Sequence, residues 1–395
     1  MAIDRPFDVT FRYPLHFTQG VVDVANPCLR DVVASRADYL PAKVAFVVDH
    51  GLLDGHPDLK EQIDEYCRRH ENVLRLMAPV LILPGGERVK NEWRYVLDVL
   101  RMMHEAMLCR HSYLVAIGGG ALLDVAGFAG AMAHRGVRLV RVPTTVLSQD
   151  DSAIGVKNGI NAFEKKNYLG TFAAPFAVIN DSRFLPTLSD RDWRAGISEA
   201  IKVALIRDAA FFEFIEGQAA ALGGRSLPVM EQLVRRSAEL HYAHITTNGD
   251  PFEQGSSRPL DYGHWAAHKL EQVTDYRLRH GEAVAIGIAL DTTYALHSGF
   301  LPERDWRRVV DLLVALGLPI YAPELSHHLD KDSDSRNVLR GLIEFQEHLG
   351  GQLTIMLLRA IGQAFDVHEI RRDVMIRSIE TLRMYSTEDI HAVKA

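Results

Sequence analysis

The sequence predicts a protein of the α/β class, in which a parallel-sheet domain (residues 1–186) precedes a mostly helical domain (residues 187–395). Three observations support this prediction. The chain has 395 residues, which is more than one hydrophobic core usually organises. Its first half alternates short apolar runs with amphipathic segments, as β/α units do. After about Thr187, apolar residues recur at helical spacing and strand signals are few.

Four short apolar runs in the first half predict strands of a Rossmann-like sheet. These runs are Val44–Val48, Val80–Leu83, Tyr113–Ile117 and Leu139–Val142. Asp49 follows the first, Pro84-Gly85-Gly86 the second, Gly118-Gly119-Gly120 the third and Pro143 the fourth. Ligands of such sheets bind beyond the carboxyl ends of the strands, so these positions are candidate binding residues.

Five segments of the second half carry apolar residues at helical spacing and predict helices. They are Trp193–Ile206, Val229–Ile245, Tyr262–Val273, Ala283–Ser298 and Arg304–Leu316. The segment after about Asp373 also mixes charged and apolar residues at this spacing, and we assign it no function.

Composition narrows the class of protein. The formal net charge is -7, which argues against nucleic-acid and membrane-surface partners because no basic excess neutralises phosphates. No apolar run approaches the ~20 residues of a membrane span. The three cysteines, Cys28, Cys67 and Cys109, form no paired framework, and no secretory signal begins the chain. We therefore expect a cytoplasmic protein.

The glycine run at residues 118–120 is the strongest local feature of the first half. Glycines after a strand let the backbone turn sharply and approach a ligand, and the following helix directs its amides at a phosphate. Gly127 and Gly130 would allow something flat to lie close to that helix. The run is not the GxGxxG fingerprint, so an ordinary tight turn stays an open alternative.

The second half carries a candidate metal site. Glu199 and Lys202 are spaced to share one helix face, as are His264 and His268, and His280 begins another predicted helix. One carboxylate and two imidazoles leave coordination positions open, as a catalytic Zn²⁺ site requires. The chain has 18 histidines, and a single histidine is more often structural or solvated, so spacing alone leaves that alternative open.

Together these motifs resemble the 3-dehydroquinate synthase family, the sugar phosphate cyclases. The resemblance extends from about Asp49 to Gly362 and is densest between Gly118 and Gly287. In the family's order, the chain carries GGG…D…AGF, RG, PTT, DS…G…K, KN…G.F, G.SE..K, D.GH…H..E and HGEAVAIG. One such match would mean little, whereas eight in order are specific.

The resemblance implies a cofactor, a metal and a set of site residues. NAD would be held by Asp49, Glu87, Lys90, Gly118, Gly119, Gly120, Asp124, Thr144, Thr145, Asp151 and Lys166, the first three towards its adenosine half. A divalent metal, usually Zn²⁺ with Co²⁺ as an alternative, would be bound by Glu199, His264 and His280. The catalytic and substrate-facing residues would be Asp151, Lys157, Lys166, Asn167, Lys202, Asp261 and His268. Lys157, Asn167 and His268 would lie near the substrate phosphate, joined by Arg135 from the other subunit of a homodimer.

The implied reaction converts a phosphorylated sugar to a cyclic ketone. Transient oxidation by NAD makes a neighbouring hydrogen acidic, phosphate is eliminated, and the carbonyl is reduced again. The freed chain then closes by an intramolecular aldol step. NAD ends as it began, so the resemblance implies a phosphate-eliminating lyase with a redox cofactor.

The sequence departs from the family around the substrate carboxylate. Counted back from His264 without gaps, a lysine, an arginine and an asparagine of the family are replaced by Ala243, Ser257 and Asp261. A further family lysine, in a late DKK turn, has no counterpart in Phe345-Gln346-Glu347-His348. A misaligned variable loop is the alternative explanation.

These losses bear on the substrate. A hydrogen bond to a charged group contributes roughly 1.5–3 kcal/mol, so losing two would weaken carboxylate binding by about two to four orders of magnitude. Asp261 and Glu347 would repel a carboxylate, while Arg258 could partly compensate. We therefore expect a phosphorylated ketose without a carboxylate, with sedoheptulose 7-phosphate the leading candidate. Asp261 in place of asparagine also resembles the cyclases that act on that sugar.

Other functions stay open. One is 3-dehydroquinate synthase activity on the phosphorylated heptulosonate. Another is a metal-dependent polyol dehydrogenase resembling glycerol dehydrogenase, which shares the two-domain plan and would release NADH. The anion-suited residues Lys157, Lys166, Asn167 and Lys202 argue against the dehydrogenase. The retained metal ligands and lysines argue against an inactive binding protein.

Overall fold

The computed structural model describes residues 3–5, 7–163, 165–247, 250–252 and 258–392. The chain divides into two compact units. The first comprises the residues up to Thr144 together with Ala153–Arg183, and the second comprises Thr145–Ser152 with the residues from Phe184 onwards. The predicted fold class, an α/β part followed by a mostly helical part, is confirmed. Thr145–Ser152 belongs to the second unit, although a division at residue 186 assigns it to the first.

A parallel sheet forms the centre of the first unit. Its strand order is β1-β9-β6-β5-β2-β3, with β4 also paired to β2, and each of these pairs is parallel. The strands are β1 (Leu15–Thr18), β2 (Ala42–Asp49), β3 (Leu74–Leu76), β4 (Leu81–Leu83), β5 (Tyr113–Gly118), β6 (Arg138–Pro143) and β9 (Ala177–Asp181). The sequence predicted β2, β4, β5 and β6 but not the other three.

The order of the strands reverses between β2 and β5. From β2 the chain continues to β3 and β4 on one side, and it then crosses to β5, whose successors β6 and β9 lie on the other side. Such a reversal opens a crevice at the carboxyl ends of the two central strands. Asp49 ends β2 and Gly118 ends β5, so both predicted binding positions lie at this crevice.

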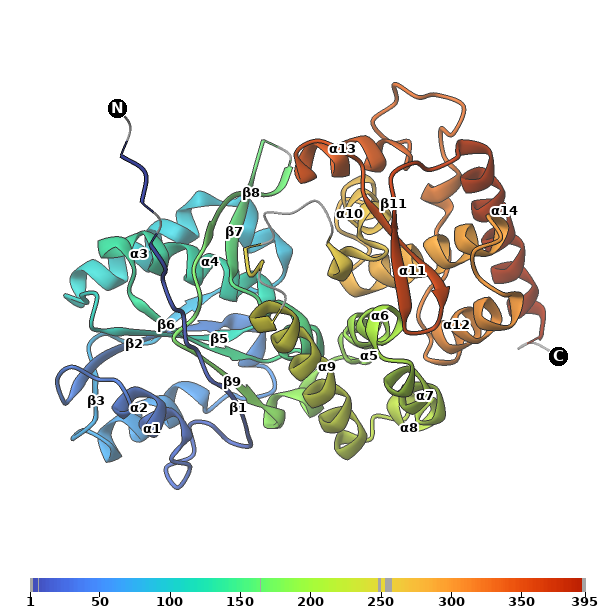
Figure 1. The fold of residues 1–395 in the computed structure, drawn as a ribbon. Helices are drawn as coiled ribbons and strands as arrows, with labels where there is room; N and C mark the ends of the chain where they lie inside the picture. The colour runs from blue at the N-terminus through green and yellow to red at the C-terminus, as the bar shows by residue number, and fades with distance from the viewer. Residues whose placement is uncertain (1–2, 6, 164, 248–249, 253–257, 393–395) are drawn as a thin grey trace. The chain divides into compact units, whose positions relative to one another are not determined.

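Helices cover both faces of this sheet, as Figure 1 shows. Helices α1 (Cys28–Ala34) and α2 (Leu59–Arg69) lie on one face, and α3 (Trp93–Glu105) and α4 (Gly120–Met132) lie on the other. Every residue of β5 is buried, because a parallel strand covered on both faces meets no water. This explains why β5 is continuously apolar and could be found from the sequence.

An antiparallel hairpin packs against α4. Its strands are β7 (Lys157–Ala162) and β8 (Lys165–Phe172), which the sequence analysis did not predict as strands. A Cβ atom at Gly127 would lie 1.7 Å from Oδ1 of Asn158 on β7, so this glycine is needed for the hairpin to approach. The flat ligand expected beside Gly127 is therefore replaced, at that position, by the protein's own hairpin.

The second unit is mostly helical. Its helices are α5 (Asp190–Ala195), α6 (Ile197–Arg207), α7 (Ala209–Gly217), α8 (Ala219–Gly223), α9 (Leu227–Thr247), α10 (His264–Val273), α11 (His280–His297), α12 (Glu303–Ala315), α13 (Arg340–Leu349) and α14 (Arg372–Ala392). A hairpin of β10 (Ile355–Ala360) and β11 (Gln363–Val367) completes it. None of the helices in the described part of the chain has the length and apolar content that a membrane span needs.

One predicted helix is divided in the structure. The segment Trp193–Ile206 forms the end of α5 and most of α6, with a break at Gly196. A Cβ atom at Gly196 would lie 2.4 Å from the backbone nitrogen of Leu147, so the break brings two backbone segments into contact. Apolar spacing alone does not reveal such a break, since both pieces keep the helical period.

Helix α11 is deeply buried, because its residues Ala283–Ala295 are all buried. One of them, Asp291, accepts hydrogen bonds from Nε1 of Trp265 (2.8 Å) and from the backbone nitrogen of Gly263 (3.1 Å). These bonds join α11 to the start of α10. Burial raises the pKa of Asp291 to about 7, against the opposing effect of the two hydrogen bonds.

We predict a pH-dependent contribution of Asp291 to stability. Because its pKa is raised by folding, the folded protein binds more protons than the unfolded one between about pH 4 and 7, so stability falls as pH rises through this window. Relative to Asp291→Asn, the wild type should lose about 2 kcal/mol of unfolding free energy between pH 5 and 7. Urea unfolding of both proteins measures this difference, and parallel pH profiles would contradict it.

Candidate active site

The first unit gathers several predicted cofactor residues at the carboxyl ends of β2 and β5. Asp49 caps the turn after β2 by accepting a hydrogen bond from the backbone nitrogen of Gly51 at 2.9 Å. Burial raises the pKa of Asp49. Gly119 precedes α4, whose first turn has no side-chain cap. The uncapped amides at the start of a helix suit a phosphate group, so this place fits a dinucleotide.

A buried lysine joins further predicted residues beside α4. Nζ of Lys90 lies 2.6 Å from Oδ2 of Asp124 and 3.9 Å from Oε1 of Glu87, and it also donates a hydrogen bond to Oδ1 of Asn167. Lys90 is 2% exposed, so these partners must offset the free-energy cost of burying its positive charge. The structure thus brings Asn167, expected at the substrate phosphate, together with Lys90 and Asp124, expected at NAD.

The other predicted residues of the first unit lie on or beside four elements. Thr144 is buried after β6 and donates its backbone N–H to the carbonyl of Gly118 at 3.1 Å. Lys157 begins β7 and is exposed, and Lys166 is half-buried on β8. Arg135 is exposed after α4 with φ 62°, in the left-handed region that non-glycine residues seldom adopt. Their roles towards a substrate, a cofactor or a second subunit stay predictions.

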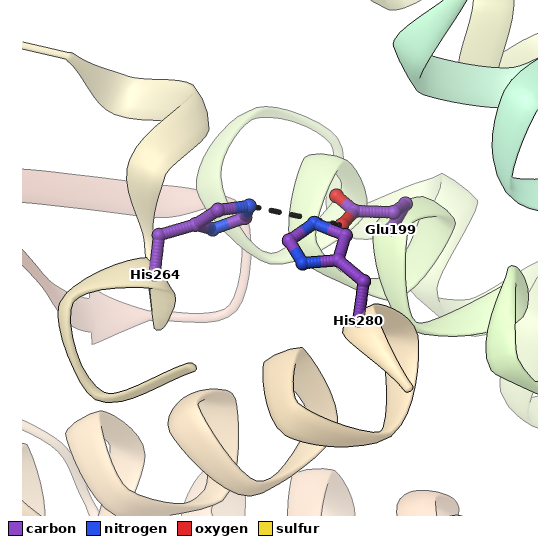
Figure 2. Close-up of side chains that lie close together, drawn as sticks. All are labelled: Glu199, His264 and His280. Carbon is purple, nitrogen blue, oxygen red and sulfur yellow. Dashed lines mark ion pairs between the residues drawn. The ribbon is translucent and has the colours of Figure 1, made fainter. Parts of the chain in front are cut away.

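In the second unit, three side chains from three helices converge, as Figure 2 shows. Glu199 comes from α6, and His264 and His280 are the first residues of α10 and α11. Oε1 of Glu199 lies 3.7 Å from Nε2 of His264 and 3.4 Å from Nε2 of His280. One ligand atom from each residue lies within 4.8 Å of the other two.

The approach of α10 to α11 sets the position of these histidines. Gly263 has φ 77° immediately before α10, and its carbonyl oxygen would lie only 1.9 Å from a Cβ atom at Gly287. A side chain at Gly287 would therefore separate the two helices. Because His264 follows Gly263 directly, this contact determines where the imidazole enters the cluster.

The cluster fits a divalent metal. Oε1 of Glu199 is fully buried and has no hydrogen-bond partner among the described residues. Leaving such an atom unpaired is costly, and a cation between it and the two imidazoles would satisfy it. Burial, followed by the charge of Lys202, lowers the pKa of His264, which keeps the imidazole neutral and able to bind metal. A carboxylate with two imidazoles is a donor set that suits Zn²⁺.

Lys202 adds a buried positive charge to this cluster. Its Nζ lies 2.5 Å from Oε2 of Glu199 and 3.5 Å from Oδ1 of Asp151, which is supplied by the π-helical turn η4 (Ser148–Ser152). Burial alone would lower the pKa of Lys202, but the two carboxylates raise it above its usual value. Burial alone would likewise raise the pKa of Asp151, but Lys202 and then His241 hold it far below its usual value. Both groups therefore stay charged at neutral pH.

A second group of potential ligands adjoins the first. It consists of His268, Glu271 and His280. Oε2 of Glu271 lies 3.0 Å from Nδ1 of His280, while Nε2 of the same ring faces Glu199. A carboxylate on the far nitrogen of a metal-binding histidine fixes the orientation of its ring. We therefore assign Glu271 to orienting His280 and the metal position to the first group.

The chain matches two sequence profiles of known protein families. Residues 80–195 match the description "3-dehydroquinate synthase N-terminal", and residues 196–334 match "3-dehydroquinate synthase C-terminal". The 3-dehydroquinate synthase of Paracoccus denitrificans is 37% identical over 358 residues, covering 89% of this chain and 91% of that protein. That of Cereibacter sphaeroides is 37% identical over 307 residues, covering 77% and 81%.

The chain belongs to the 3-dehydroquinate synthase family. Among solved structures it is similar to the 2-epi-5-epi-valiolone synthase of Streptomyces hygroscopicus, described with NAD⁺ and Zn²⁺ bound. The TM-score is 0.84 and the identity 28%, over 98% of this chain and 100% of that one. A 2-deoxy-scyllo-inosose synthase, with a TM-score of 0.73 and 23% identity over 92% and 95%, shares the fold.

The residue that α9 directs at the cluster is not the one expected from the sequence. Ala243, reached by counting without gaps, is exposed on α9. From the same helix, the buried His241 lies with Nδ1 3.1 Å from Oδ1 of Asp151. An ionisable side chain thus reaches the cluster from α9, two residues before Ala243.

The other residues at which the sequence departs from the family differ in how close they lie to the cluster around Lys202. Asp261, in the turn before α10, lies close enough to Lys202 to help raise its pKa. Glu347 is exposed on α13, so the expected repulsion of a carboxylate rests on Asp261. Ser257 lies outside the described residues. The side chain of His348 is likewise outside the described part.

Two residues near the cluster were not singled out from the sequence. His241 contacts Asp151 and Glu271 contacts His280, each from a different element. Glu271 could have been found, because it lies three residues after His268 and shares its helix face. His241 carries no local signal, since it is one of two histidines on α9.

We predict that metal binding distinguishes the two groups of potential ligands. Glu199→Gln should weaken the binding of Zn²⁺ by more than about 100-fold, which exceeds the usual effect of an outer-shell partner. His268→Ala, the matched control, should change it by less than about 10-fold. Competition with a chromogenic chelator measures both affinities. The reverse order of effects would assign the metal to His268, Glu271 and His280 instead.

Proposed function

We propose that this protein is a sugar phosphate cyclase that eliminates phosphate from a phosphorylated ketose and closes the product to a cyclitol ketone. The observation that carries the proposal is the buried cluster of Glu199, His264 and His280 joined to the cationic Lys202. Membership of the 3-dehydroquinate synthase family supports it. The proposed reaction makes the enzyme a phosphate-eliminating lyase in which NAD acts transiently.

Two groups would be held by the chain. NAD would bind at Asp49, Glu87, Lys90, Gly118, Gly119, Gly120, Asp124, Thr144, Thr145, Asp151 and Lys166, and a divalent metal, Zn²⁺ or Co²⁺, at Glu199, His264 and His280. The similar valiolone synthase structure, which contains NAD⁺ and Zn²⁺, supports this assignment. NAD when bound supplies a reversible hydride acceptor, and the metal supplies a Lewis acid.

Lys202 and Asp151 would set the charge around the substrate oxygens. Because its pKa is raised, Lys202 keeps its proton and would stabilise negative charge that develops on an oxygen. Asp151 stays ionised and, with Glu199, keeps the ammonium in place. Lys157, Asn167 and His268 would bind the phosphate, which must be recognised before it can leave.

The substrate proposed is a ketose without a carboxylate, with sedoheptulose 7-phosphate the leading candidate. Asp261 supports it, because a carboxylate beside Lys202 competes with any substrate carboxylate for the same cation. His241 supports it too, since its imidazole can form a hydrogen bond with a hydroxyl group.

The relatives favour a second candidate. They are named 3-dehydroquinate synthase and share 37% identity with most of this chain, which supports the phosphorylated heptulosonate as substrate. A polyol dehydrogenase is supported by fold alone, through a probable glycerol dehydrogenase from Sinorhizobium meliloti with a TM-score of 0.61 and 16% identity.

A direct assay separates these candidates. Purified protein is incubated with NAD, Zn²⁺ and one substrate at a time: sedoheptulose 7-phosphate, the phosphorylated heptulosonate, or glycerol. We expect phosphate release from the heptulose, at least about 100-fold faster at equal low concentration than from the heptulosonate, given the lost charged hydrogen bonds. Preferential turnover of the heptulosonate would contradict the substrate proposal. Accumulation of NADH with glycerol, without phosphate release, would contradict the cyclase itself.

We also propose that the enzyme is a homodimer in which Arg135 completes the site of the partner. Its exposure and left-handed backbone are consistent with a side chain held outward. Glu199→Gln and Arg135→Ala are each expected to be nearly inactive. Mixed and allowed to exchange subunits, they should regain about a quarter of wild-type activity, because half the dimers are mixed and each mixed dimer has one intact site.

The matched control mixes subunits that carry Glu199→Gln with subunits that carry Lys157→Ala. Both of these residues are assigned to the site of their own subunit. This mixture should stay inactive. Failure of the Arg135→Ala mixture to recover, although the subunits exchange, would place Arg135 in its own subunit's site or in none.

A further inference from the structure

The segment between η4 and β7 is held by an unusually complete set of hydrogen bonds to its carbonyl oxygens. Arg141 donates through Nη1 to the carbonyls of Ala153 (2.9 Å) and Gly155 (2.6 Å), and through Nη2 to that of Lys157 (3.0 Å). The hydroxyl group of Tyr13 donates to the carbonyl of Ile154 at 2.9 Å. Finally, the backbone nitrogen of Ala173 donates to the carbonyl of Val156 at 2.8 Å.

Each carbonyl from residue 153 to residue 157 therefore has a donor, and one guanidinium supplies three of the five. Residues 153–156 form neither helix nor strand, so no repeating ladder fixes their backbone. Buried carbonyls must find partners somewhere, and here a single side chain provides most of them. The conformation of this segment, and with it the position from which Lys157 extends, depends on Arg141.

The guanidinium itself is in an unusual environment. Arg141 is 1% exposed, and its Nε has no hydrogen-bond partner among the described residues. It donates hydrogen bonds to carbonyl and amide oxygens, while burial lowers its pKa and the smaller effect of the Asp124 carboxylate raises it. Burying a cation costs free energy, and a neutral residue of similar size at this position would avoid that cost. The positive charge directly beneath the segment favours an anion near it.

Asn158 extends this arrangement to helix α4. Its Oδ1 accepts a hydrogen bond of 2.7 Å from Nη2 of Arg141, and its Nδ2 donates to the carbonyl of Ala173 at 3.3 Å. Gly127 on α4 leaves the space that the Asn158 amide occupies. Arg141, Asn158 and Gly127 thus form one packed unit beneath the start of β7.

We propose that Arg141 is the positioning residue for phosphate recognition, holding residues 153–157 so that Lys157 is presented to the phosphate of the substrate. This inference rests on the proposed function, in which Lys157 binds that phosphate. Arg141 does not touch the substrate in this account. It acts through the backbone it binds and through its buried charge.

The proposal depends on the fork of Arg141, which is the pair of terminal guanidinium nitrogens that donate in different directions. The two terminal nitrogens of Arg141 reach four acceptors, which the single ammonium of a lysine cannot do at comparable geometry. Arg141→Lys therefore keeps the charge but loses the fork. Arg141→Gln loses both, and Gly127→Ala displaces Asn158 while leaving Arg141 unchanged.

The test compares KM, kcat and the inhibition constant of inorganic phosphate in these three variants. We expect Arg141→Lys and Gly127→Ala to raise KM for the sugar phosphate and Ki for phosphate by about 10-fold each, the effect of one charge-assisted hydrogen bond. We expect kcat to fall by less than about 3-fold, since the metal ligands belong to the other unit. Arg141→Gln should have the largest effect on Ki.

Arg138→Lys is the matched control, because Arg138 is on the same strand and binds Asp38, the Arg36 carbonyl and the Tyr113 hydroxyl instead. It should leave Ki for phosphate unchanged even if it lowers the unfolding temperature. Equal changes of KM and kcat without a change of Ki, or a Ki as insensitive in Arg141→Lys and Gly127→Ala as in the control, would overturn the inference.

Lys157→Ala separates this inference from the proposed function. If Lys157→Ala weakens phosphate binding and the Arg141 and Gly127 variants do not, the inference fails and the phosphate site stands. If Lys157→Ala leaves phosphate binding unchanged, the assignment of Lys157 fails, and the inference fails with it. If the wild type neither binds nor releases phosphate, the proposed function itself is wrong.

Discussion

The candidate active site of the second unit depends on one buried cation. Lys202 is 2% exposed and lies between Glu199 and Asp151, whose carboxylates come from a helix and from a separate turn. Removing water from three charges costs several kcal/mol for each, and only their mutual attraction offsets it. Removing Lys202 would leave two buried carboxylates without a compensating positive charge. The fold must therefore bring α6 and η4 together before this cluster can be buried at all.

The first unit contains two further buried cations, Lys90 and Arg141, and their charges are compensated in different ways. Lys90 is neutralised by Asp124, as Lys202 is by its carboxylates. Arg141 is instead solvated by backbone carbonyls, which have dipoles but no net charge. The difference matters for function, because a neutralised cation attracts anions weakly while a carbonyl-solvated one keeps its field. In a protein with a net charge of -7, such local positive fields decide where an anionic ligand can bind.

The sequence predicted those features that depend on local pattern. Strand β5 was recognisable because it is buried on both faces, and His264 and His268 because four residues bring side chains to one helix face. Glu199 and His280 were candidates from the residue pattern and the resemblance added Asp151, and the structure brings the three together in the second unit. The family itself is confirmed by the comparisons.

What the sequence did not predict depends on contacts between distant segments. The short strands β1 and β9 are defined by pairing with each other across more than a hundred residues. The break at Gly196 is required by a backbone contact with Leu147, and His241 on α9 reaches Asp151, which is distant from it in the sequence. Arg141 resembled an ordinary basic residue of a strand, because its role lies in the loop that it solvates. None of these contacts produces a periodic pattern in the sequence.

The central claim is that NAD is used transiently while phosphate is eliminated. The most direct measurement follows deuterium in a phosphorylated ketose labelled at the carbon that bears the oxidised hydroxyl group. The account predicts a cyclic product that retains the deuterium at that carbon, with phosphate released and no accumulation of NADH. Deuterium recovered in reduced cofactor, with NADH formed in proportion to turnover, would identify a dehydrogenase and contradict the account.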